Sequence, residues 1–190
     1  MLILASQSPR RKELLGHLNM PFTVRVADID ETTDPFVPPE DEVARLSYEK
    51  ALAIERQPED IVIAADTIVV LDGRVLGKPR DEEDAADMLR RLSGRHHQVM
   101  TGVTVLRGDR TITRTEITHV HFRHLSDKEI ARYVATGEPM DKAGSYGIQG
   151  GASLFVEAIH GDYYNVMGLP VCRLWQMLLT IAPELTEELP

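Results

Sequence analysis

The sequence predicts an α/β protein built on one large mixed sheet. Segments with the character of strands alternate along the chain with segments of helical periodicity. A continuous apolar run over residues 61–71 is typical of a strand buried on both faces. The length of 190 residues, 43% of them hydrophobic, is enough for a substantial core. Because no internal repeat or linker divides the chain, we expect a single domain over residues 1–182 and an acidic, frayed tail over residues 183–190.

The first part of the chain begins with a short strand that leads into a helix. The apolar residues 2–5 form the strand, Ser8 is a good N-cap, and Pro9 suits the first helical position. Three elements are expected to follow: a strand over residues 22–26, a loop rich in acid and proline over residues 28–41, and a helix over residues 43–54.

Turn and cap signals set the boundaries of the later elements. Asp72-Gly73 is a two-residue hairpin turn directly after the apolar run. Asp81 is a candidate N-cap for a helix over residues 82–92, and Ser126 to Glu129 has the pattern of a capping box. The other expected elements are a hairpin of strands over residues 99–106 and 112–122, a helix from Ser126 to Gly137, an irregular glycine-rich stretch over residues 138–151, a strand over residues 154–159 and a closing helix over residues 171–181.

Charge and cysteine content exclude several classes of protein. With 21 Lys and Arg against 30 Asp and Glu, the net charge of −9 gives no general reason to coat nucleic acid or an anionic membrane. Positive charge for an anionic ligand must therefore be local. The single cysteine, Cys172, excludes an internal disulfide and a Cys-rich zinc module. No run approaches the roughly 20 apolar residues that a membrane span needs, and we expect a cytoplasmic protein.

The turn between the first strand and the first helix is a candidate phosphate site. The sequence lacks the glycine fingerprints of P-loop and Rossmann proteins. Ser6, Ser8, Arg10 and Arg11 instead place hydroxyls and guanidinium groups at a helix N-terminus, where backbone N–H groups are free. The alternative is an ordinary N-cap followed by solvated arginines.

Asp66 is the second candidate, because it interrupts an otherwise apolar strand. A carboxylate in such a place is costly unless it is paired, hydrogen-bonded or bound to a metal. A plausible role is metal ligand or general base. The alternative is a strand that ends at Asp66 and leaves the acid in solvent.

The remaining polar candidates are weaker on local sequence. Lys78 lies between a hairpin and a helix start, where an anion could dock, and Gln149 lies in a glycine-rich stretch and carries an amide that can pair with a base edge. Glu31, in an acidic run, and Lys50 are most simply surface residues. Adjacent His96-His97 would face opposite sides of a strand and make a poor metal pair.

Taken together, these segments resemble the Maf family of nucleoside triphosphate pyrophosphatases over nearly the whole chain. Five motifs in order are more specific than any one of them. They are Ala5-Ser6-Gln7-Ser8-Pro9-Arg10-Arg11-Lys12-Glu13-Leu14-Leu15, Ala65-Asp66-Thr67, Gly77-Lys78-Pro79-Arg80-Asp81, Gly144-Ser145-Tyr146-Gly147-Ile148-Gln149-Gly150, and Gly161 to Pro170 with the pattern G-x-x-x-x-V-x-G-L-P.

The resemblance implies a fold and an activity. The fold would be similar to that of inosine-triphosphate pyrophosphatases: an elongated mixed β-sheet flanked by helices, in two lobes with a central cleft. The activity would be metal-dependent hydrolysis of a nucleoside triphosphate to the monophosphate and pyrophosphate, with Mg²⁺ or Mn²⁺ as the cofactor. The pattern Tyr146 to Gly150 is similar to that of the branch acting on dTTP and UTP, and modified pyrimidine nucleotides are further candidate substrates. A homodimer is implied by the resemblance alone.

The same resemblance implies roles for individual residues. Asp66 would be the catalytic acid/base residue and, with Glu31, a metal ligand. The residues implied in substrate binding are Ser6, Arg10, Arg11, Lys50, Thr67, Lys78 and Gln149. For Glu31 and Lys50, only the family pattern argues against a plain surface role. The alternative function is a nucleotide-binding regulator of septum formation with weak or no hydrolysis.

Overall fold

The computed structural model describes residues 1–26, 28–34 and 36–188, so residues 189–190 of the expected tail lie outside it. Its strands are β1 (Leu2–Leu4), β2 (Phe22–Val24), β3 (Ile61–Leu71), β4 (Arg74–Leu76), β5 (His96–Arg107), β6 (Arg110–Phe122) and β7 (Val156–His160). Its α-helices are α1 (Pro9–Gly16), α2 (Pro39–Leu52), α3 (Glu82–Leu92), α4 (Asp127–Val134), α5 (Tyr163–Met167) and α6 (Val171–Ile181). Four short 3₁₀ helices are η1 (Glu138–Asp141), η2 (Ala143–Ser145), η3 (Gly151–Leu154) and η4 (Pro183–Glu188), counted within the same described residues.

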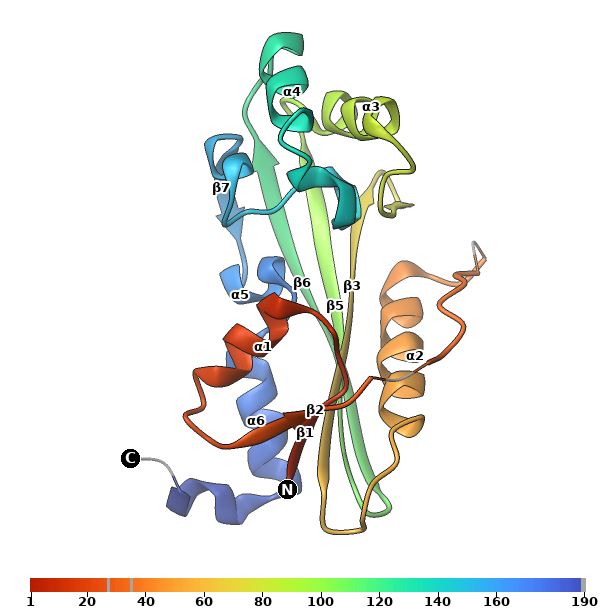
Figure 1. Cartoon of the computed structure of the whole chain (residues 1–190), viewed down its shortest axis with the longest axis vertical. Helices are drawn as coiled ribbons and strands as arrows, with labels where there is room; N and C mark the ends of the chain where they lie inside the picture. Colours follow the sequence, from red (N-terminus) through yellow and green to blue (C-terminus); the bar gives the residue numbers. More distant parts are fainter. Residues whose placement is uncertain (27, 35, 189–190) are drawn as a thin grey trace. The chain divides into compact units, whose positions relative to one another are not determined.

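A mixed sheet organises these elements, which confirms the predicted α/β class (Figure 1). Among the described residues seven strands take part, in the order β2-β1-β3-β5-β6-β7, with β4 paired to β3. Strand β1, next to the edge strand β2, runs parallel to both β2 and β3. The pairs β3–β4 and β6–β7 are antiparallel. The order is an open path rather than a ring, so the sheet is not closed.

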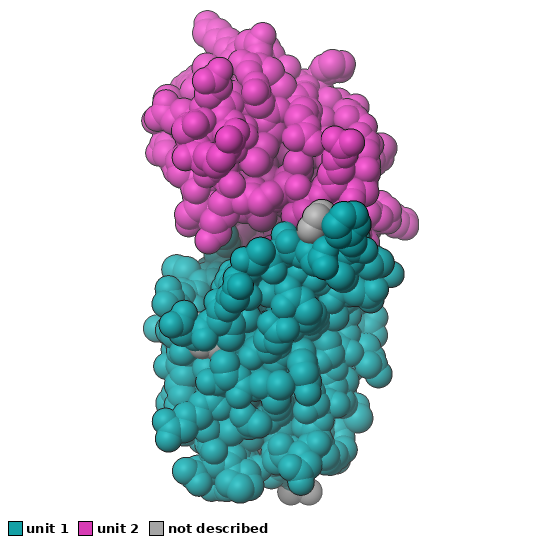
Figure 2. Space-filling view, turned by 90° about the vertical axis from the view of Figure 1, so that its right-hand side faces the viewer, with its two compact units in different colours: residues 1–66, 101–116, 168–190 teal, residues 67–100, 117–167 magenta. Residues whose placement is uncertain are grey.

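The chain divides into two compact units, which Figure 2 shows in different colours. Unit 1 consists of residues 1–66, 101–116 and 168–190, and unit 2 of residues 67–100 and 117–167. Each unit therefore joins stretches that are far apart in the sequence. No helix among the residues described is long and apolar enough to cross a membrane.

In unit 1, helices cover both faces of the strands: α1 and α6 lie on one side and α2 on the other (Figure 1). Ser8 caps α1 by accepting a hydrogen bond from the backbone of Arg11, as predicted. Helix α2 approaches β5 closely because residue 102 is glycine. A Cβ at Gly102 would lie 2.1 Å from the carbonyl oxygen of Val43. The core contains fully buried apolar side chains from every layer, including Ile3, Leu14, Leu46, Ile63 and Leu178.

In unit 2, α3 and α4 pack side by side (Figure 1). Both start at the predicted caps. Asp81 accepts a hydrogen bond from the backbone of Asp84, and Ser126 and Glu129 form a reciprocal capping box. On the other side of the unit, Oγ1 of Thr118 on β6 accepts from the backbone N–H of Asp162 at 3.0 Å, directly before α5.

The structure differs from the sequence-based expectation in several places. Helix α2 begins at Pro39, within the loop expected over residues 28–41, and β7 begins at Val156 rather than at residue 154. Helix α5 was not expected, because its five residues are too few to show a helical period. Strand β5 begins at His96 rather than at residue 99, since the polar residues His96, His97 and Gln98 gave no apolar pattern there. The expected tail is structured over residues 183–188: Leu185 is buried and Glu184 forms an ion pair with Arg107.

Candidate functional site

Asp66 lies within β3, and its environment excludes the alternative of a solvated strand end. The residue is only 9% exposed, and the strand continues through buried residues on both sides of it. Lys50 reaches it from α2: Nζ of Lys50 lies 2.7 Å from Oδ1 of Asp66, and Lys50 is 8% exposed. The expectation from local sequence that Lys50 is a surface lysine was therefore wrong. A buried carboxylate needs such a partner, because an unpaired charge in a core is very costly.

A second carboxylate binds the same ammonium group. Oε1 of Glu31, in the loop before α2, lies 3.0 Å from Nζ of Lys50. The Glu31 side chain is 61% exposed, so this contact is far more open to solvent than the Lys50–Asp66 contact. Local sequence alone had favoured a solvated Glu31. The structure places it at the edge of a cluster in which two carboxylates from different elements converge on one cation.

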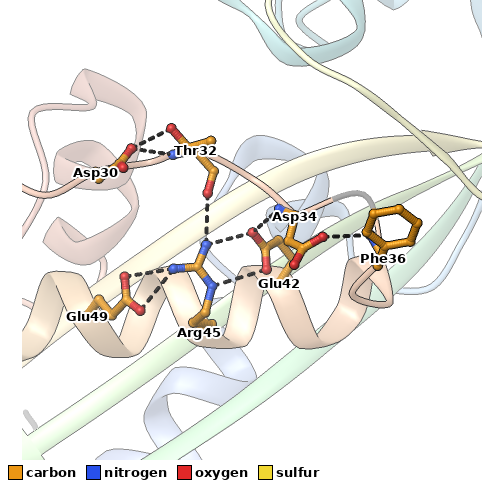
Figure 3. Close-up of polar contacts among 7 residues, drawn as sticks. All are labelled: Asp30, Thr32, Asp34, Phe36, Glu42, Arg45 and Glu49. Carbon is orange, nitrogen blue, oxygen red and sulfur yellow. Dashed lines mark hydrogen bonds and ion pairs between the residues drawn. The ribbon is translucent and has the colours of Figure 1, made fainter.

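The loop that carries Glu31 is fastened to α2 by Arg45 (Figure 3). One guanidinium N–H of Arg45 donates to the carbonyl oxygen of Thr32 at 3.0 Å, directly after Glu31 in the chain. The remaining N–H groups bind the carboxylates of Glu42 and Glu49 on the same helix. Arg45 thus links the loop backbone to two fixed acids.

Glu42 completes this attachment from the middle of the network (Figure 3). Although it is a carboxylate, it is only 1% exposed. Its Oε1 accepts a hydrogen bond from the backbone N–H of Asp34 at 3.0 Å. Hydrogen bonds from Arg45 hold the pKa of Glu42 below its usual value. The hydrogen bonds that Arg45 donates to Glu42, and to a lesser extent those it donates to Glu49, raise the pKa of Arg45. The network therefore stays charged while it restrains residues 32–34.

The predicted phosphate turn is formed by Ser6, Ser8 and Arg11. Oγ of Ser6 accepts from the backbone N–H of Ser8 at 3.2 Å and from Nη1 of Arg11 at 3.4 Å. Nε of Arg11 donates to the carbonyl oxygen of Gly168 at 2.9 Å, a residue that follows 157 positions later. The side chain of Arg10, beside it, makes no hydrogen bond or ion pair with any residue in the described part of the chain. Its guanidinium remains available to an anion.

Electrostatics connect Arg11 with the acidic cluster. The pKa of Arg11 lies below its usual value, mainly because burial removes solvent from the guanidinium. The charge of Asp66 opposes this shift, the neighbouring charge of Arg10 adds to it, and the charge of Glu31 also opposes it. An arginine stays protonated under such shifts. Unit 1 therefore contains three cationic side chains, those of Arg10, Arg11 and Lys50, in the same region as two acids.

The two converging carboxylates fit a divalent cation of the hard class. Mg²⁺ is usually held by one or two carboxylates together with substrate phosphates and water. Asp66 and Glu31 supply that number of protein ligands, and each has a second carboxylate oxygen besides the one that contacts Lys50. No group of three or more His, Cys, Asp or Glu side chains suited to a metal occurs within the described residues. The donor set fits Mg²⁺ or Mn²⁺ bound together with a phosphate ligand.

Unit 2 contains the other predicted site residues. Thr67 is half-buried on β3, Lys78 is exposed in the loop after β4, and Gln149 is exposed between η2 and η3. The two loops meet, because the backbone N–H of Gly144 donates to the carbonyl oxygen of Gly77 at 3.0 Å. Gly144 has a φ of +67°, and a Cβ there would lie 2.9 Å from Val69, so this contact requires glycine.

A buried histidine supports the glycine-rich loop of unit 2. His97 is 3% exposed, and its Nε2 lies 2.8 Å from the hydroxyl of Tyr146 in that loop. As predicted from their adjacency, His96 is exposed while His97 is buried. Burial, with smaller effects from His96 and His121, lowers the pKa of His97 to about 3. His97 is therefore neutral at physiological pH and acts as a hydrogen-bonding group.

Sequence reasoning missed several of these contacts. The carbonyl group of Gly168 lies in a motif that was quoted for the resemblance, yet no local signal pairs it with Arg11. A signal for Arg45 was present, since Glu42 and Glu49 stand three and four positions from it on one helix. Lys50 also stands seven positions after Val43 and four after Leu46, on the apolar face of α2. That position already indicated burial.

The chain is similar in sequence to a family of known proteins over most of its length. The family model described as Maf-like protein matches residues 1–181. A dTTP/UTP pyrophosphatase of Symbiobacterium thermophilum is 55% identical over 93% of this chain and 92% of its own length. Proteins with the same name from Bacillus cytotoxicus and Bacillus mycoides are 52% and 48% identical, over 90% and 97% of this chain and 91% and 97% of their own lengths. Among solved structures, a HAM1 protein from Coxiella burnetii aligns with a TM-score of 0.48 and 14% identity, over 95% of this chain and 98% of that one.

Proposed function

The chain belongs to the Maf-like protein family, and from this premise we propose that it hydrolyses dTTP and UTP to the nucleoside monophosphate and pyrophosphate. Relatives named dTTP/UTP pyrophosphatase are 48–55% identical to it over at least 90% of this chain and of their own lengths. The structural observation that carries the proposal is the cluster in which Lys50 binds both Asp66 and Glu31. A protein that only bound nucleotides would need cations but no buried carboxylate beside them.

Arg10, Arg11 and Ser6 bind the phosphates in this proposal. Arg10 is free to pair with a phosphate oxygen, and Arg11 is held in place by Ser6 and Gly168. The backbone N–H groups at the start of α1 add further donors and the positive end of the helix dipole. Since phosphoryl transfer depends mainly on positioning and charge neutralisation, several fixed donors are the expected arrangement.

Asp66 acts as the general base. A water molecule attacks the α-phosphorus, its proton passes to a carboxylate oxygen of Asp66, and the bond between the α-phosphorus and the bridging oxygen breaks to release pyrophosphate. Lys50 holds the Asp66 carboxylate in one orientation through the 2.7 Å contact. Mg²⁺ or Mn²⁺, held by Asp66 and Glu31, would supply positive charge that polarises the phosphoryl group.

The unit 2 residues receive their roles from the family pattern. Lys78 contributes positive charge toward the phosphates, and both Thr67 and Gln149 contribute to substrate choice. Exposure of Lys78 and Gln149 is compatible with these roles. The family resemblance also supports a homodimer in the cytoplasm, and sedimentation of the purified chain tests the dimer.

The decisive experiment is pyrophosphate release from a panel of nucleoside triphosphates with Mg²⁺, with Mn²⁺ and with a chelator. We expect release from dTTP and UTP that needs the metal and is lost in Asp66→Asn, while the variant keeps the circular dichroism spectrum of the wild type. Asp109→Asn, in the exposed turn between β5 and β6, is the matched control and keeps full activity. Nucleotide binding without pyrophosphate release would contradict the proposal and favour a regulatory protein.

A further inference from the structure

In unit 2, one tyrosine and one glutamate form a fixed pair beside the glycine-rich loop. Tyr133 lies near the end of α4 and is 5% exposed, and Glu138 begins η1. The hydroxyl of Tyr133 donates a hydrogen bond to Oε1 of Glu138 at 2.9 Å. Nζ of Lys142 donates to the backbone carbonyl of Glu138 at 2.6 Å, which fixes the main chain beneath the carboxylate. The pair therefore has a defined position before any ligand binds.

This pair holds the loop on both sides of Gln149. Before Gln149, the backbone N–H of Gly147 donates to the hydroxyl oxygen of Tyr133 at 3.2 Å. After it, the backbone N–H of Gly151 donates to Oε2 of Glu138 at 3.0 Å. The hydroxyl of Tyr133 and both carboxylate oxygens of Glu138 are thus all engaged in hydrogen bonds. Gln149 lies midway in sequence between the two attached residues, Gly147 and Gly151.

Two glycines of the loop lie directly against neighbouring side chains, which would have to move if a Cβ were added. A Cβ at Gly150 would lie 2.1 Å from Oε1 of Glu138, and a Cβ at Gly147 would lie 2.8 Å from Cε of Lys142. Gly147 and Gly150 do not have the positive φ that would require glycine on conformational grounds. Their lack of a side chain instead permits the backbone to rest against the Glu138 carboxylate and the Lys142 side chain.

The Gln149 side chain itself is left unengaged. It is exposed, and its amide makes no hydrogen bond to any residue in the described part of the chain. A restrained backbone that carries a free amide suits recognition of a base edge, because less freedom is lost on binding than from a mobile loop.

We propose that Tyr133 and Glu138 are positioning residues that set the base preference of the enzyme through Gln149. The inference rests on the proposed function, since it assigns to this pair the orientation of the amide that pairs with uracil or thymine. Neither residue needs to touch the substrate. Their effect on selectivity passes through the backbone of residues 147–151.

The test compares kcat/KM for UTP and CTP, which share sugar and phosphates and differ at the base edge. Glu138→Gln retains one acceptor oxygen where the carboxylate used two, so the amide can satisfy either Tyr133 or Gly151 but not both. Tyr133→Phe removes the acceptor of Gly147. We expect either variant to lower the UTP/CTP ratio by about tenfold, mainly through a higher KM for UTP. Glu83→Gln and Tyr48→Phe, at exposed positions that make none of these hydrogen bonds, are matched controls that leave the ratio unchanged.

Two further measurements separate positioning from general loss of structure. Amide hydrogen exchange should accelerate over residues 147–151 in Glu138→Gln and remain unchanged in α4. In a Gln149→Ala background, Glu138→Gln should cause no additional loss of selectivity, because the two residues act through one amide.

The outcomes distinguish this inference from the function on which it rests. A wild type that releases no pyrophosphate from UTP overturns the proposed function and the inference with it. If the wild type prefers UTP and Gln149→Ala removes that preference, retained selectivity in both Glu138→Gln and Tyr133→Phe overturns the inference alone. Additive losses in the double variant, or unchanged exchange over residues 147–151, also overturn it.

Discussion

Nζ of Lys50 lies 2.7 Å from Oδ1 of Asp66, although the two residues belong to different elements and neither is more than 9% exposed. The buried Asp66 carboxylate is tolerable in this position because Lys50 compensates its charge, whereas Lys50 is itself compensated by both Asp66 and Glu31. Removing one partner of such a pair leaves an uncompensated charge with little water around it. The contact therefore joins the stability of unit 1 to the chemistry that we propose for Asp66.

The first prediction concerns this pair. Lys50→Met keeps the aliphatic stem and removes the charge, and we expect it to lower the free energy of unfolding by about 3–5 kcal/mol. Lys128→Met, at an exposed position on α4, should change it by less than about 0.5 kcal/mol. Urea denaturation of both variants checks the prediction. Equal stability of the two would show that Asp66 does not depend on Lys50.

The second prediction concerns the loop that carries Glu31. Arg45→Lys replaces a guanidinium that binds three groups with an ammonium that cannot reach all of them. We expect faster hydrogen exchange at residues 32–34 and an about tenfold higher Mg²⁺ concentration at half-maximal activity. Arg132→Lys, on the exposed side of α4, is the control. Unchanged exchange and metal dependence in Arg45→Lys would rule out this role.

The third prediction concerns pH. Burial lowers the pKa of His97 to about 3, against 6.5 in the unfolded chain. Between these values the unfolded chain binds a proton that the folded chain cannot, so His97 makes stability fall as pH drops below 6.5. At pH 5 the loss relative to pH 7.5 is about 2 kcal/mol. The variant His97→Gln lacks the imidazole. Its free energy of unfolding should therefore fall by about 2 kcal/mol less than that of the wild type between pH 7.5 and pH 5. His119→Gln, at an exposed position, should leave it as in the wild type.

The fourth prediction compares two glycines. Gly102→Ala forces a methyl group against the backbone of Val43, and we expect a loss of about 1–3 kcal/mol in unfolding free energy as α2 is pushed from β5. Gly16→Ala, in a helical position with no atom within 4 Å of the added Cβ, should instead gain about 0.5–1 kcal/mol. Thermal unfolding of both variants provides the measurement. A neutral Gly102→Ala would mean that α2 and β5 separate without cost.

Local chemistry explains which parts of the fold were predictable. Ser8, Asp81 and Ser126 cap their helices as expected, because a cap depends on residues within one helical turn. The extent of β3 was also predicted, since a long apolar run ended by Asp72-Gly73 leaves little choice. Helix α5 was missed because five residues carry no periodic signal.

The candidate site was predictable only in part, because its contacts join distant segments. The apolar strand around Asp66 already indicated a buried acid. Nothing in residues 28–31 indicates that Glu31 reaches Lys50, since that contact depends on how the loop lies over α2. The Tyr133–Glu138 pair likewise becomes visible only when the loop backbone is placed. The family pattern supplied candidate residues, and the structure supplied their neighbours.

The hydrogen bond from Arg11 to the carbonyl of Gly168 has a consequence for synthesis on the ribosome. The Arg11 side chain emerges early, but its acceptor follows 157 residues later, with the segment that also contributes α6 to unit 1. In a chain made from its N-terminus, the first strand and helix of unit 1 therefore lack their last packing partners until all of unit 2 has been translated. Unit 2, whose two stretches are complete by Met167, can fold earlier. The phosphate turn of the nascent enzyme gains its final constraint only when residue 168 has left the exit tunnel.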